Sequence, residues 1–74
     1  MQHKDLQIQL RDRLKQLRKR YQLTQEELAR KAGLSLYYVQ LLEGKKPKNP
    51  TLLVLEKIAK VYNIPVWKLI RFDK

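Results

Sequence analysis

The sequence predicts an all-α fold, a compact bundle of five helices in one small domain that spans residues 1–74. A chain of 74 residues, 43% of them hydrophobic, is long enough for one domain with a modest core. Its apolar residues recur at steps of three and four, whereas a half-buried strand would show alternation. Residues 24–44 also contain the start and stop signals of two short helices joined by a tight turn. These observations favour helices throughout.

The first helix is expected from about Leu6, after residues 1–5, which carry no strong signal and are expected to form a loose arm. Apolar residues then recur along one face of a long helix, namely Leu10, Leu14, Leu17 and Tyr21. The opposite face is basic, with Arg11, Arg13, Lys15, Lys19 and Arg20.

The second helix begins after Thr24, which is followed three residues later by Glu27. This spacing lets the hydroxyl and the carboxylate each satisfy a backbone N–H at the helix start. Leu28 and Ala32 lie four residues apart on one face. Gly33 then tolerates the left-handed conformation that ends many helices, so the helix is expected to stop there.

The third helix is expected over residues 36–43, with Ser35 as its N-cap. So short a turn between the two helices makes them cross steeply, which requires a small side chain at Ala29. A rotation of about 100° per residue places Val39 and Leu42 inward. The outward side chains are then Leu36, Tyr37, Gln40 and Leu41, with Tyr38 near the boundary.

A loop rich in lysine and proline covers residues 45–50. Asn49 followed by Pro50 is a typical N-cap and first-turn pair, which predicts a fourth helix over residues 51–62. The buried face of this helix is expected to contain Leu52, Leu55, Ile58, Ala59 and Tyr62.

Asn63 is expected to end the fourth helix in a left-handed conformation, and Pro65 opens a last short helix over residues 66–71. This C-terminal segment has more apolar surface than one small core can cover, so we expect a homodimer with an interface made by Val66, Trp67, Ile70 and Phe72. The alternative is that Trp67 closes the core of the monomer.

Three motifs, "LTQEELARKAGLS", "VQLLE" and "KNPTL", stand at characteristic spacings. Through them the chain, from about Leu14 to Leu69, resembles the helix-turn-helix domain of the phage repressor and Cro family, also called the xenobiotic response element family. The resemblance implies a sequence-specific transcriptional regulator, in particular a repressor. It would bind a palindromic site in double-stranded DNA as a dimer and insert helix 36–43 into the major groove.

The same resemblance implies roles for individual residues. Gln25 matches a glutamine that contacts a DNA phosphate, and the exposed N–H groups at a helix start also favour an anion there; the alternative is a solvated side chain. Arg18 and Glu43 match a salt bridge that ties the first helix to the end of the recognition helix. The remaining residues expected at phosphates are Tyr38, Lys45, Lys46 and Lys48.

The residues expected to face the bases depart from the family. Members commonly present Gln, Arg, Asn or Ser at such positions, since these side chains pair with base edges. In this chain only Gln40 and the tyrosine hydroxyls can hydrogen-bond a base, while Leu36 and Leu41 can touch only thymine methyl groups. The alternative is that some of these apolar residues pack against the protein itself.

The formal net charge is +10, and it is unevenly distributed. Residues 1–23 hold seven basic and two acidic side chains, residues 24–44 two and three, and residues 45–74 eight and two. Basic flanks around a motif that is not itself basic are expected where the flanks hold the backbone of a polyanion and the motif enters a groove. The alternative is that the lysines only keep the surface soluble.

Other classes of function find little support. The chain has no cysteine and one histidine, His3, so we expect no metal, cofactor or small-molecule ligand and no enzyme activity. No apolar run reaches the length of a membrane span and the first residues do not read as a signal peptide, so we expect a cytoplasmic protein.

The second hypothesis for the function is a protein-interaction module, such as an antitoxin or a coactivator-like partner. Membrane-surface binding by residues 66–72 is a weaker third.

Overall fold

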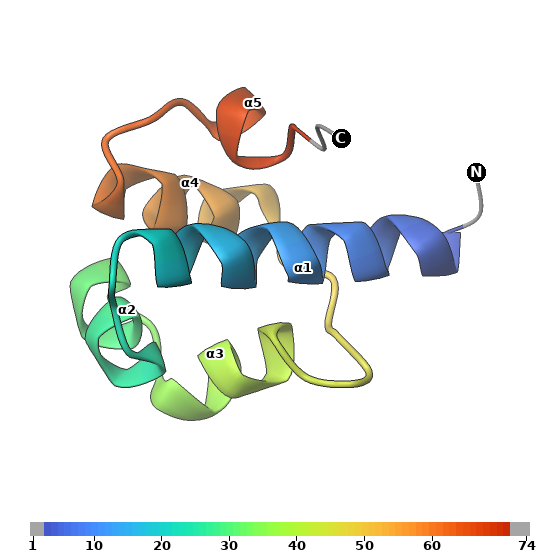
Figure 1. Ribbon diagram of the computed structural model, residues 1–74, viewed down its shortest axis with the longest axis horizontal. Helices are drawn as coiled ribbons and strands as arrows, with labels where there is room; N and C mark the ends of the chain where they lie inside the picture. The colour runs from blue at the N-terminus through green and yellow to red at the C-terminus, as the bar shows by residue number, and fades with distance from the viewer. Residues whose placement is uncertain (1–2, 72–74) are drawn as a thin grey trace.

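The computed structural model describes residues 3–71, with side chains from Leu6 onward. In these residues five helices follow one another and no strand occurs (Figure 1). The all-α expectation is therefore confirmed. The helices are α1 (His3–Arg20), α2 (Gln25–Ala32), α3 (Leu36–Leu42), α4 (Leu52–Val61) and α5 (Val66–Leu69).

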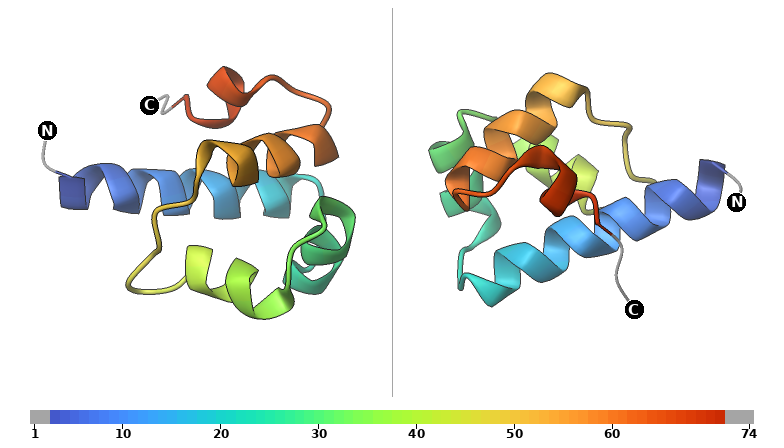
Figure 2. Two further views of the ribbon diagram at one scale, coloured as in Figure 1. Left: turned by 180° about the vertical axis from the view of Figure 1, so that it is seen from behind. Right: turned by 90° about the horizontal axis from the view of Figure 1, so that it is seen from above.

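The long helix α1 runs through the whole molecule, and its N-terminal end projects past the other helices (Figures 1 and 2). Helices α2 and α3 pack against each other, α4 packs on α2, and α5 folds back onto α4. Only short loops separate α1 from α2 and α2 from α3, whereas a longer loop connects α3 to α4. The arrangement leaves α3 at the surface, next to that loop.

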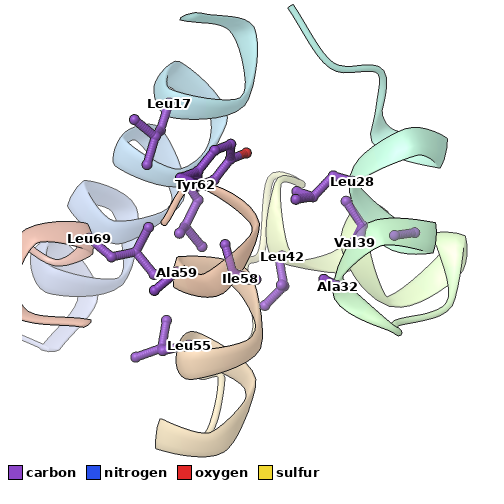
Figure 3. Packing of buried hydrophobic residues seen from close by; sticks show 12 residues of the cluster. Leu17, Leu28, Ala32, Val39, Leu42, Leu55, Ile58, Ala59, Tyr62 and Leu69 are labelled. Atoms are coloured by element: carbon purple, nitrogen blue, oxygen red, sulfur yellow. The ribbon is translucent and has the colours of Figure 1, made fainter. Parts of the chain in front are cut away.

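Helix α4 lies at the centre of the core (Figure 3). Its Ile58 points toward Leu28 and Leu42 of the α2–α3 pair, while Leu55 and Ala59 lie on the side of Leu69 from α5. Burial of one such aliphatic side chain contributes about 1.5–3 kcal/mol to the free energy of folding. The buried core residues are Leu14, Leu17, Leu28, Ala29, Ala32, Val39, Leu42, Leu55, Ile58, Ala59, Tyr62 and Leu69.

The signals at both ends of α2 are confirmed. Oγ1 of Thr24 accepts a hydrogen bond from the backbone N–H of Glu27 at 3.0 Å, and Oε1 of Glu27 accepts one from the N–H of Thr24 at 2.8 Å. These bonds, chiefly the one from the Thr24 backbone, lower the pKa of Glu27. Gly33 has φ 71°, and the N–H of Leu34 donates back to the carbonyl of Ala29 at 2.8 Å.

The next helix start and one later stop are also as expected. Oγ of Ser35 accepts from the N–H of Tyr38 at 3.0 Å and so caps α3. Asn63 has φ 56° and ends the helical segment formed by α4. Gln22 has φ 58°, a left-handed turn between α1 and α2 that no glycine or asparagine marks in the sequence.

Several expected boundaries are wrong. A loose arm was expected over residues 1–5, but helix α1 begins at His3. The N-cap of α4 is Thr51, whose Oγ1 accepts from the N–H of Val54 at 3.1 Å, because a threonine two residues after Asn49 offers the same bond. Helix α5 ends at Leu69, before the expected Arg71.

The expected burial of Leu52 is also wrong, since its side chain is 72% exposed. Its neighbour Leu53 is 60% exposed, and the first core residue of α4 is Leu55. A helical projection gives the direction of a side chain but does not show whether another helix lies opposite it. The first turn of α4 therefore presents two leucines to solvent.

Candidate nucleic-acid interface

The outward face of α3 is apolar and accessible. Tyr37 is 70% exposed and Leu36 is 38% exposed, Gln40 is exposed and Leu41 is half-buried. On the inward face of the same helix, Val39 and Leu42 are buried, so the inward and outward directions expected from the helical repeat are confirmed. The four outward side chains are thus available to a ligand.

Tyr38 takes a different position from its neighbour Tyr37. Its side chain is half-buried and packs against the core, so packing against the protein itself accounts for one apolar residue of α3. The phosphate contact expected of its hydroxyl stays a prediction.

Arg18 and Glu43 join α1 to the end of α3. Nε and Nη2 of Arg18 donate to Oε2 and Oε1 of Glu43 at 2.8 and 2.9 Å, and both residues are 8% exposed. This two-point geometry is the strongest form of an arginine–carboxylate pair. The hydrogen bond to Glu43 raises the pKa of Arg18, which keeps the guanidinium charged. Nη1 of Arg18 also donates to the carbonyl of Leu23 at 2.6 Å, so the same side chain holds the turn before α2.

Gln25, in the first turn of α2, is half-buried. Its Nε2 donates to Oε1 of Glu43 at 3.0 Å, so the alternative of a simply solvated side chain is wrong. An amide nitrogen carries two hydrogens, and the bond to Glu43 uses one of them. The phosphate contact expected of Gln25 stays a prediction that this geometry permits.

The loop between α3 and α4 is held at both ends by α1. Nη1 of Arg11 donates to the carbonyl of Gly44 at 3.3 Å, and Nε2 of Gln7 donates to Oδ1 of Asn49 at 2.7 Å. Gln7 and Arg11 are four residues apart and therefore lie on one face of α1. The lysines expected at DNA phosphates, Lys45, Lys46 and Lys48, are exposed between these two anchors.

The basic face of α1 is partly engaged inside the molecule. Nε and Nη2 of Arg13 donate to the carbonyls of Leu69 and Lys68, at the C-terminal end of α5, at 3.2 and 2.9 Å. Arg11 pairs with Asp12 at 3.0 Å besides its bond to Gly44. The sequence pattern does not indicate these roles, because the carbonyls lie far along the chain from the two arginines.

The C-terminal segment divides into a buried and an exposed part. Leu69 is fully buried, and half-buried Val66 packs on the core. Trp67 is 62% exposed and Ile70 40% exposed, so the alternative in which Trp67 closes the monomer core is wrong and Leu69 fills that role. Phe72 lies outside the described residues.

Metal-ligating and membrane-spanning features do not occur within residues 3–71. No group of three or more His, Cys, Asp or Glu side chains in this range could hold a metal ion. Nor is any helix of that region both long and apolar enough to cross a bilayer.

Comparison with known proteins agrees with this geometry. A family model described as "Helix-turn-helix" matches residues 14–66, which include α2, α3 and α4. An uncharacterized HTH-type transcriptional regulator of Archaeoglobus fulgidus is 41% identical over 64 residues, 86% of this chain and 90% of that protein. A second such regulator from the same organism is 37% identical and also covered over 90% of its length. The HTH-type transcriptional regulator SinR of Bacillus subtilis is 36% identical over 58 residues, 78% of this chain and 52% of SinR. The chain therefore belongs to the helix-turn-helix family of the phage repressor and Cro type.

Proposed function

We propose that this protein is a sequence-specific regulator of transcription, acting as a repressor, that binds double-stranded DNA and inserts α3 into the major groove. The observation that carries the proposal is the presentation of α3, which exposes Leu36, Tyr37 and Gln40 on a helix capped at its start by Ser35. An α-helix fits the width of the major groove. The relatives in Archaeoglobus fulgidus and Bacillus subtilis bear the name of HTH-type transcriptional regulators, which agrees with this function.

The phosphate backbone would be held on both sides of α3. Gln25 stands at the start of α2, where the free N–H groups and the helix dipole favour an anion. Lys45, Lys46 and Lys48 stand in the loop after α3, and Tyr38 is placed between these regions in the chain. Because the bonds from Gln7 and Arg11 fix both ends of that loop, the lysines lose less freedom on binding than they would in an unattached loop.

We place the dimer interface at the C-terminal segment, with Val66, Trp67, Ile70 and Phe72. The exposure of Trp67 supports this, because large aromatic side chains serve as anchors at the centres of interfaces. A two-fold axis there would set the two recognition helices on half-sites about 34–36 Å apart, one turn of DNA.

Selection of bound duplexes from a random library at physiological salt tests the function directly. The expected result is enrichment of a palindromic sequence whose half-sites repeat at about one helical turn. Recovery of random sequence, with no motif above the starting library, would contradict sequence-specific binding.

The exposed apolar face of α3 also supports a second candidate, a protein-interaction module on the same fold. Tyr37 leaves 70% of its surface open to solvent, and exposed aromatic anchors are typical of protein interfaces. Tyr37→Ala separates the two functions. It should cost about 1–3 kcal/mol on the selected duplex and much less on random DNA if Tyr37 reads a base. Unchanged affinity for both duplexes would favour the protein partner.

A further inference from the structure

The outward face of α3 has few groups that can hydrogen-bond a base. The helix sequence, LYYVQLL, contains no charged residue, and its polar side-chain groups are the amide of Gln40 and two tyrosine hydroxyls. The polar side chains that flank it make hydrogen bonds within the protein. Oγ of Ser35 accepts the N–H of Tyr38, and the carboxylate of Glu43 accepts bonds from Arg18 and Gln25. Recognition by this face therefore has to depend largely on apolar contact.

The two leucines on this face stand in different rows. Leu36 and Gln40 are four residues apart and form one row along the helix, and Tyr37 and Leu41 form the adjacent row. Each row thus combines one leucine with one hydrogen-bonding side chain. Leu36 is 38% exposed and Leu41 is half-buried, so both have apolar surface left to cover.

A leucine in the major groove discriminates between bases by desolvation. Guanine, adenine and cytosine present polar atoms at their major-groove edges, whereas thymine also presents its C5 methyl group. A polar edge that loses water against a leucine, without gaining a hydrogen bond, weakens binding. A methyl group in the same place instead gains by leaving water.

We propose that the protein recognises thymine C5 methyl groups, which contact Leu36 and Leu41 in each half-site. The inference rests on the proposed DNA-binding function and specifies the chemistry of the sequence that is bound. The loop that follows α3 exposes Lys45, Lys46 and Lys48, which attract a polyanion. DNA is therefore the partner whose phosphates can bind this loop while its bases contact the apolar face of α3.

The test uses the selected duplex and replaces its thymines one at a time by deoxyuridine, which differs only by the missing methyl group. Each contacted thymine should lose about fourfold in affinity, the equilibrium equivalent of burying one CH2 group. Thymines outside the two contacts should show no change. Placing 5-methylcytosine at a contacted position should give tighter binding than cytosine there.

The protein variants assign each methyl group to its leucine. With Leu36→Ala, the deoxyuridine effect at one thymine of each half-site should vanish while the effect at the other persists, and Leu41→Ala should show the converse. Leu53→Ala is the matched control, since Leu53 is an exposed leucine on α4 that should leave both effects intact. Melting temperatures report whether half-buried Leu41 is also needed for folding.

Three outcomes are distinguishable. Loss of affinity at specific deoxyuridine positions supports the inference, and the measurement needs only the unaltered protein. Enrichment of a palindrome that binds equally well with thymine and deoxyuridine everywhere would overturn the inference and leave the proposed function standing. Failure to enrich any duplex would overturn both.

Discussion

Arg18 and Glu43 meet at two points, with Nε to Oε2 at 2.8 Å and Nη2 to Oε1 at 2.9 Å, although they lie on α1 and at the end of α3. Glu43 also accepts the amide of Gln25, and Arg18 also donates to the carbonyl of Leu23. This network connects α1, the start of α2 and the end of α3. It therefore fixes α3, the proposed recognition helix, relative to Gln25, the residue proposed to contact a DNA phosphate.

Removing one partner of this pair should destabilise the protein strongly. Arg18→Ala leaves the carboxylate of Glu43 buried without its guanidinium, which should cost about 3–5 kcal/mol of unfolding free energy. Urea unfolding followed by circular dichroism measures this. Arg20→Ala, at an exposed position two residues further along α1, is the control and should change stability by less than about 0.5 kcal/mol. The double variant Arg18→Met, Glu43→Met should be more stable than Arg18→Ala; an equal loss would show that the pair itself, rather than the stranded charge, is what matters.

The hydroxyl of Tyr62 should make stability depend on pH in the alkaline range. Its oxygen is buried without a hydrogen-bond partner among the described residues, and burial raises the pKa of Tyr62 to about 12. In the unfolded chain a tyrosine has a pKa near 10, so the folded state holds the proton more tightly. The resulting stability is complete below about pH 10 and should be lost as the pH rises toward about 12.

Tyr62→Phe provides the comparison for this pH dependence. The variant should lack the part of the decline that Tyr62 causes, on the order of 2 kcal/mol between pH 10 and 12. At pH 7 it should be as stable as the parent or more so, because an unpartnered buried hydroxyl is removed. A clear loss of stability at pH 7 would mean that the hydroxyl has a partner, such as an ordered water molecule.

The loop lysines should account for part of the salt dependence of DNA binding. Replacing Lys46 and Lys48 together by Ala should weaken binding to all sequences about equally and reduce the slope of log K against log salt by about 0.9 for each phosphate that is no longer neutralised. Lys57→Ala with Lys60→Ala removes the same charge from exposed positions on α4 and should leave the slope closer to that of the parent. A sequence-selective loss in the loop variant would instead assign these lysines to bases.

Trp67→Ser should convert a dimer to a monomer with little effect on folding. The side chain is 62% exposed in the isolated chain, so its replacement removes little core packing and the melting temperature of the monomer should change by only a few degrees. Sedimentation equilibrium over a range of concentrations measures the association. Leu53→Ser, another exposed apolar position, is the control. A parent protein that stays monomeric at every concentration, both free and on DNA, would rule out the C-terminal interface.

The sequence alone determined the helices whose signals are local. The capping pair Thr24 and Glu27, the left-handed Gly33 and the cap Ser35 each act on backbone groups within five residues, so their effect can be read without knowing the rest of the fold. The same holds for the inward direction of Val39 and Leu42, which follows from the helical repeat. For Arg18 and Glu43 the resemblance to the family supplied the pairing that spacing along the chain does not indicate.

Only the tertiary structure decided which of these directions meet another part of the chain. The helical repeat places Leu52 on the same face as the core residues of α4, yet no helix covers it. Arg11 and Arg13 were expected on a solvent-exposed basic face, but they donate to carbonyls 33 to 56 residues away in the chain. A count of charges in the sequence does not distinguish a lysine that faces solvent from an arginine that is bound to a carbonyl. The physical reason is that burial and long-range hydrogen bonds depend on how whole helices pack, whereas caps and helical faces depend on the residues within one or two turns.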